Sequence, residues 1–183
     1  MTHPRGAWNS RRQRRALALA ASAFLSLAAF GCGGDSPLVP GLGTGSLTTT
    51  GAVSASGSGL AVFQTTSSGG TSLFQIAISP VSQSATTWQL QIANYSGRLA
   101  AGTYALAPLS SSATNPTANF YYTSGGTTQQ FNSTSGQLVI TSSSSSEVRG
   151  TFNFTATNPA ASTSSVTAQG SFIAQCPPGV TCQ

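Results

Sequence analysis

Apolar and polar residues alternate along most of the chain after residue 46. Short runs rich in Thr, Val, Ile and aromatic residues, such as "TSLFQIAIS" and "TTWQLQIANY", are separated by clusters of Gly, Pro, Asn and Ser. A period of two with turn residues between the runs is typical of β-strands, and no run carries the apolar stripe of an amphipathic helix. We therefore expect residues 47–175 to form an all-β domain of about eight or nine short strands.

The apolar face of several runs can be assigned residue by residue. Trp88, Leu90 and Ile92 alternate with glutamines, and the same alternation selects Phe74, Ile76, Ile78, Leu138, Ile140, Val148, Gly150, Phe152 and Phe154. Half-buried strands of an antiparallel sheet alternate in this way, whereas parallel βαβ units need helices and fully apolar strands. The length suits one antiparallel β-sandwich or one closed up-and-down barrel, and the pattern leaves both open.

The N-terminal segment has a different pattern. Arg11, Arg12, Arg14 and Arg15 precede an apolar run over residues 16–30. As a helix, this run of about 15 residues would be about 22 Å long, shorter than a hydrocarbon core of about 30 Å. A basic segment followed by an apolar run of this length and small residues is the arrangement of a secretory signal peptide. We assign residues 1–31 to it rather than to a buried helix.

The apolar run ends at "AFGC", residues 29–32. This sequence resembles the lipobox of bacterial lipoproteins, in which Gly or Ala precedes an invariant cysteine, as Gly31 precedes Cys32. The resemblance implies acylation of Cys32 and anchoring in the lipid bilayer, which two or three acyl chains make stable. It also implies the outer rather than the inner membrane, because Gly33 and not Asp follows Cys32. The alternative is a conventional signal peptide cleaved nearby, with Cys32 as a free thiol.

After Cys32 the chain continues with "GGDSPLVPGLGTGS", residues 33–46. Several glycines and two prolines among small residues are typical of unpacked chain. We therefore interpret residues 32–46 as a lipidated cysteine and a flexible tether that joins the lipid to the β-domain.

The formal net charge of +5 comes entirely from the segment before Cys32. Without that segment the charged residues are Asp35, Arg98, Glu147 and Arg149, with no lysine or histidine. A nearly neutral domain offers no basic groove for nucleic acid, which we exclude as a partner. So few charges also protect sheet edges poorly, which favours closure of the sheet or self-association.

Cys176 and Cys182 lie in "CPPGVTC" near the C-terminus. In an exported chain, a close pair across a Pro-Pro-Gly turn favours a structural disulfide, here closing a loop within residues 176–183. A redox motif would need Cys-x-x-Cys, and a zinc site would need further Cys or His ligands. The alternative is a pair of free thiols.

The domain lacks the side chains of known catalytic arrangements. It has no histidine or lysine to activate its many serines, and its carboxylates are Asp35 in the tether and Glu147 in an expected loop. Nucleophilic and acid–base catalysis need such partners, so we expect no enzyme activity, no cofactor and no metal site. Ligand binding stays open, because Trp88, Tyr121 and Tyr122 could stack on sugar rings or line the mouth of a barrel.

The C-terminal half carries a family resemblance. The segments "SGQLVITS", "VRGTFNFTA" and "VTAQGSF", between Ser135 and Phe172, with "GTYAL" at residues 102–106, resemble a recurrent pattern in small bacterial lipoprotein domains of unknown function. The resemblance implies an exported all-β domain and brings no activity.

We therefore predict a non-catalytic lipoprotein of the cell envelope with a structural or interaction role, whose partner is an envelope protein or glycan. The alternative is a β-module that binds a carbohydrate or a small apolar ligand through exposed aromatic residues. A hollow of ligand size beside these residues would favour the alternative, and a filled interior with a plain surface would favour the first interpretation.

Overall fold

The alternating runs form nine β-strands in the computed structural model, which describes residues 42–68, 70–82, 84–108 and 115–182. The strands are β1 (Gly43–Gly51), β2 (Ala55–Ser68), β3 (Thr71–Pro80), β4 (Thr86–Asn94), β5 (Gly102–Ala105), β6 (Thr117–Ser124), β7 (Thr127–Ser143), β8 (Glu147–Asn158) and β9 (Ala161–Gln175). The all-β prediction is confirmed. No helix among the described residues has the length and hydropathy needed to cross a membrane.

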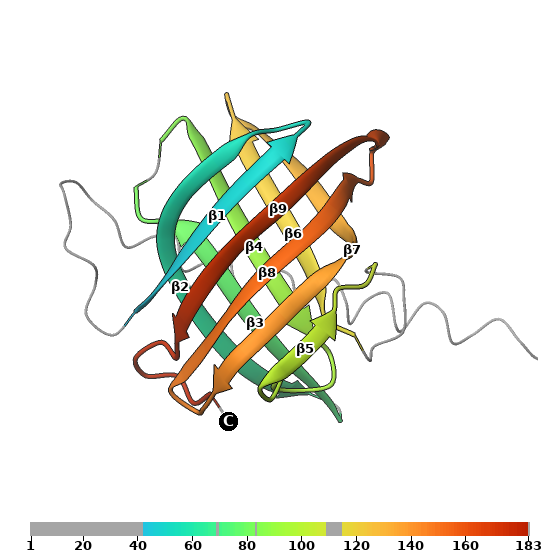
Figure 1. Cartoon of the computed structure of the whole chain (residues 1–183). Helices are drawn as coiled ribbons and strands as arrows, with labels where there is room; N and C mark the ends of the chain where they lie inside the picture. Colours follow the sequence, from blue (N-terminus) through green and yellow to red (C-terminus); the bar gives the residue numbers. More distant parts are fainter. Residues whose placement is uncertain (1–41, 69, 83, 109–114, 183) are drawn as a thin grey trace, which may run out of the picture. The chain divides into compact units, whose positions relative to one another are not determined.

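The strands form one sheet that closes on itself (Figure 1). Antiparallel pairs follow the chain from β1 to β4 and from β6 to β9, β4 pairs with β6, and β9 pairs with β1. This ring corresponds to an up-and-down barrel, one of the two predicted architectures. The short β5 pairs with residues 137–140 of β7, on the same edge as β6 and below the part of β7 that pairs with β6.

The ring is filled by the side chains predicted to face inward. Phe63, Phe74, Phe120, Phe131 and Phe154 are at most 2% exposed, and all twelve positions named from the alternation are buried. Small barrels are usually filled in this way, so the interior is a packed core.

Between β8 and β9, Phe172 packs over Gly150 and Phe152 packs over Gly170. A Cβ at either glycine would lie within 2.8 Å of the opposite ring.

Two expectations about element boundaries need correction. Residues 43–46, predicted to belong to the tether, are the start of β1. A Cβ at Gly43 would overlap the carbonyl oxygen of Ile173, so this glycine permits close approach of strands rather than flexibility. The strands are also not all short, since β2, β7 and β9 have 14, 17 and 15 residues. Polar Thr, Ser and Gln residues extend the apolar runs, because threonine favours strands and the outer face of the ring accepts polar side chains.

In the view of Figure 1 the ring has an upper and a lower end. The upper end carries the connections β1–β2, β3–β4, β6–β7 and β8–β9. The lower end carries the start of β1, the connection β7–β8 and the C-terminal residues 176–182.

Candidate functional site

The wall of the ring has a notch at the upper end, because β3 stops below its neighbours. β3 ends with Pro80 opposite Gly59, although β2 begins at Ala55. The pairing of β3 with β4 stops at Leu90, although β4 begins at Thr86. Proline has no N–H to donate, so Pro80 ends the ladder. No described strand lies between residues 55–58 of β2 and residues 86–89 of β4.

A hollow of about 410 Å³ occupies this notch. Its volume lies in the lower part of the range of small-molecule sites, about 300–1,000 Å³. The aromatic side chains on it are Trp88 and Tyr122. The lining also includes Ser54, Ser56, Ser58, Ser82, Ser84 and Thr86. Ser56 and Ser58 flank the inward-facing Gly57, so their side chains point to the outer face of β2. None of the described lining side chains carries a charge.

Trp88 forms the floor of the hollow. It faces inward from β4, is 7% exposed and caps the upper end of the core. Its indole N–H donates no hydrogen bond to any of the described residues. Trp88 Nε1 is not fully buried, so its N–H is open to the hollow rather than sealed in the core.

Gly57 faces the indole from β2. A Cβ at this position would lie 3.7 Å from Trp88 Nε1 and 3.9 Å from Trp88 Cζ2, which is ordinary contact. The site therefore has room for a side chain that the sequence omits, and the omission leaves the indole N–H open to the hollow. Sequence reasoning missed Gly57, since a glycine among serines carries no signal of its own.

The structure separates the three aromatic residues predicted as a ligand site. Tyr122 pairs directly with Trp88, is half-buried and packs against the core beside it. Tyr121 faces outward between Gln89 and Gln130, because neighbouring residues of a strand point to opposite faces. Burial and the nearby Tyr95 raise the pKa of Tyr121. Trp88 and Tyr122 therefore border the same hollow, while Tyr121 belongs to the outer surface, and binding of a ligand by these residues stays a prediction.

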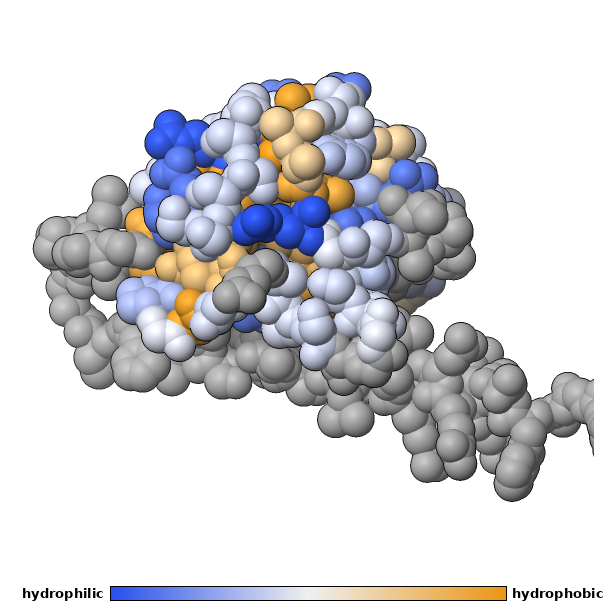
Figure 2. Space-filling view, turned by 90° about the horizontal axis from the view of Figure 1, so that it is seen from below, coloured by the Kyte–Doolittle hydropathy of each residue, from blue (hydrophilic) through white to orange (hydrophobic). Residues whose placement is uncertain are grey.

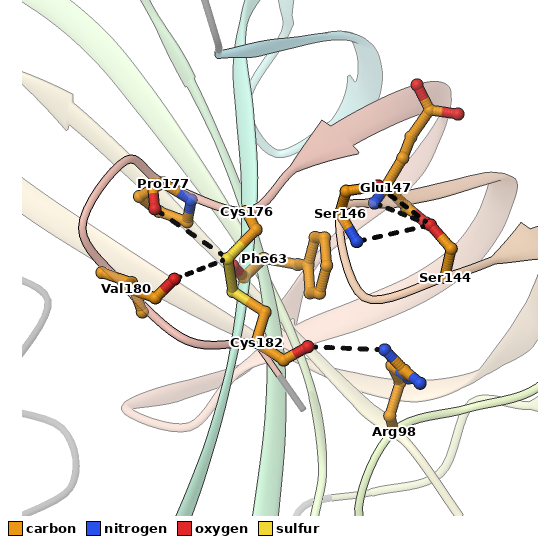
Figure 3. Close-up of a disulfide and its surroundings, with 9 residues drawn as sticks. All are labelled: Phe63, Arg98, Ser144, Ser146, Glu147, Cys176, Pro177, Val180 and Cys182. Carbon is orange, nitrogen blue, oxygen red and sulfur yellow. Dashed lines mark hydrogen bonds between the residues drawn. A yellow bond between two sulfur atoms is a disulfide. The ribbon is translucent and has the colours of Figure 1, made fainter.

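The lower end is covered by a disulfide, as predicted. Cys176 and Cys182 are bonded, and Cys182 is 3% exposed with its sulfur 3.3 Å from the carbonyl oxygen of Phe63 (Figure 3). The Cys176 N–H donates to the Ser146 carbonyl oxygen at 3.0 Å. The C-terminal loop is therefore tied both to the core and to the β7–β8 connection.

The charged side chains of the described residues gather at this same end. Arg98 donates from Nη1 to the Cys182 carbonyl oxygen at 3.4 Å. Arg149 pairs with Glu147 at the start of β8, and Gln175 donates to the same carboxylate at 2.7 Å. Figure 2 views this end from below and shows small hydrophobic areas between polar side chains. The hydrogen bond from Arg149 lowers the pKa of Glu147.

A second hollow, of about 420 Å³, lies over β1, β8 and β9. Its lining is polar, and Ser46 and Ser171 share a hydrogen bond of 3.1 Å across it. Its aromatic member, Phe152, is 3% exposed and belongs to the core. This surface therefore offers less ring area to a ligand than the notch does.

Cys32, the predicted lipidation site, lies outside the described residues, as do the predicted signal peptide and residues 32–41 of the tether. Within the described ranges, no group of three or more His, Cys, Asp or Glu side chains could hold a metal ion.

Comparisons with known proteins identify a family, but the function of that family is unknown. The model of a family described as a domain of unknown function (DUF6252) matches residues 62–175, from within β2 to the last residue of β9. No curated protein and no solved structure matches the chain.

Proposed function

This chain belongs to the DUF6252 family, whose function is unknown, and from its own residues we propose a non-catalytic lipoprotein of the bacterial cell envelope. In this proposal Cys32 is acylated and holds the protein in the bilayer, with the outer membrane favoured over the inner one. The β-domain then has a structural or interaction role, with an envelope protein or glycan as partner.

The distribution of ionisable groups supports the absence of catalysis. The serines around the notch have no charged neighbour among its described lining residues, and Arg98, Glu147 and Arg149 lie at the lower end. A serine nucleophile needs a base beside it, and acid–base catalysis needs groups that titrate near the working pH. This separation of the notch serines from the charged side chains is the observation that carries the proposal of a non-catalytic domain. Self-association stays a prediction. Unprotected sheet edges were the reason for it, and the closed ring pairs most of those edges.

The direction of β1 supports a role for the free upper end. β1 begins at the lower end with Gly43, and about ten residues of chain, at most about 36 Å when extended, separate it from Cys32. The proposed anchor therefore joins the domain at its lower end. The notch lies at the other end of the ring from the first residue of β1.

Replacement of the cysteine tests the anchor. We expect Cys32→Ser to release the protein from the membrane fraction and to abolish palmitate labelling, because no other acylation site is proposed. A matched control replaces Cys176 and Cys182 with serine, which should leave both membrane fractionation and labelling unchanged. Membrane association of Cys32→Ser equal to that of the native protein would contradict the anchor.

A second candidate function is binding of a carbohydrate or a small apolar ligand. The specific observation behind it is the notch, where Trp88 and Tyr122 meet in a hollow of ligand size. A thermal-shift screen of the full chain against sugars and apolar compounds tests it. Stabilisation by a ligand that depends on Trp88 supports this function, and no shift across such a screen counts against it.

A further inference from the structure

We propose that the notch beside Trp88 binds a neutral saccharide. This inference rests on the second candidate function and names its ligand class. The site consists of the indole N–H of Trp88, the ring of Tyr122, the free space over Gly57 and the surrounding hydroxyl groups.

The lining distinguishes a sugar from the other ligand classes. A charged ligand would lose water without meeting an opposite charge, since none of the described lining residues is charged, and such burial is costly. A wholly apolar ligand would cover serine hydroxyls without offering them hydrogen bonds, which also costs free energy. A sugar ring has an apolar face for Tyr122 and hydroxyls for the serines and threonine, so it satisfies both parts of the lining.

The Trp88 N–H supplies an oriented donor for such a ligand. Its side chain is more than nine-tenths buried and fixed by the core, while its N–H lacks an acceptor among the described residues. A sugar hydroxyl in the hollow can accept from it. Because the donor is already fixed, binding loses little side-chain freedom at this point.

The two strand edges beside the notch add further polar groups. Residues 55–58 of β2 and residues 86–89 of β4 have no described strand between them, so both edges present backbone N–H and C=O groups toward the gap. Ser84 already donates to the carbonyl oxygen of Thr86 on this edge. The remaining groups suit a ligand that both donates and accepts hydrogen bonds, as sugar hydroxyls do.

Trp88 also reports on the site. The chain contains two tryptophans, Trp8 and Trp88, so a Trp8→Phe background assigns all tryptophan emission to Trp88. In that background the full chain is titrated with cellohexaose, maltohexaose, xylohexaose, mannohexaose and chitohexaose, and with the apolar probe N-phenyl-1-naphthylamine. We expect at least one hexaose to change the Trp88 emission saturably below about 10 mM, and the apolar probe to leave it unchanged.

Two variants locate the binding, with calorimetry as the readout. Gly57→Leu fills the hollow at a position where a Cβ meets only ordinary contacts, and we expect it to weaken binding at least tenfold with an unchanged melting temperature. Trp88→Phe removes the donor but keeps a ring, and we expect about threefold to tenfold weaker binding. Gly102→Leu is the matched control, because this strand glycine lies on β5 and also has room for a Cβ. It should bind as the native protein does.

Each contrary outcome overturns the inference in a distinct way. No response to any hexaose overturns it. Binding of the apolar probe alone, lost in Gly57→Leu, overturns the saccharide but keeps a ligand-binding function. Hexaose binding unaffected by Gly57→Leu places the site elsewhere. The membrane anchor is decided separately by Cys32→Ser, so its failure and the failure of this inference are not confused.

Discussion

The two ends of the barrel close the same core in different ways. At the lower end a covalent loop folds back, Cys182 packs against Phe63, and Arg98 holds the Cys182 carbonyl. At the upper end Trp88, with the half-buried Tyr122 beside it, caps the core below an uncharged hollow.

What stops each strand explains this difference. Pro80 ends β3 early and leaves a gap in the wall above it, whereas β9 continues into a Pro-Pro-Gly turn that a disulfide fixes against the core. The same alternation of apolar and polar residues builds both ends. A few turn residues then decide which end is sealed and which keeps an open hollow.

The largest effect should come from removing the cap of the upper end. We expect Trp88→Ala to lower the free energy of unfolding by about 3 kcal/mol, because a large buried ring leaves a cavity. Trp88→Phe should cost less than about 1.5 kcal/mol, since a ring still fills the position. Urea denaturation measures both. Equal losses in the two variants would show that the volume of Trp88 does not hold the upper end together.

The sealed end should respond to loss of its disulfide by a smaller amount. Replacing Cys176 and Cys182 with serine should lower the free energy of unfolding by about 2 kcal/mol, because the bond closes a short loop in the unfolded chain. The native protein should lose a similar amount in a reducing agent. Affinity at the notch should stay unchanged, since the disulfide lies at the opposite end. A change in affinity would mean that the two ends are coupled.

The smallest effect should come from the ion pair of the lower end. Glu147 has a pKa below its ordinary value of 4.5, so its contribution to stability is present above that pH and is lost as the pH falls through the lowered pKa. The pair is exposed, so we expect Glu147→Gln to shift the melting temperature at pH 7 only slightly, and less at high salt. The small difference from the native protein should vanish in acid. A difference that grows in acid would contradict this sign.

The sequence alone predicts the inward-facing residues and the disulfide, but it does not predict how distant strands pair. Alternation identified the inward positions of β3, β4 and β8, and the spacing of Cys176 and Cys182 predicted the disulfide, because both signals are local. The pairing of β1 with β9 joins distant parts of the chain and has no local signature.

Glycines were the main source of error and omission. Gly43 and Gly45 resemble a tether in composition, yet they belong to β1, where neighbouring strands and side chains leave no room for a Cβ. Gly57 looks like any turn residue, although its missing side chain opens the notch. A glycine in a sequence does not reveal whether it serves flexibility, close contact or empty space.

One measurement tests the role of the upper end most directly. In the Trp8→Phe protein a ¹H–¹⁵N spectrum contains a single indole signal, that of Trp88. We predict that this signal shifts along a saturable curve when a neutral hexaose is added, and that it stays in place in Gly57→Leu. An indole signal that none of the hexaoses moves would contradict a binding site at the notch.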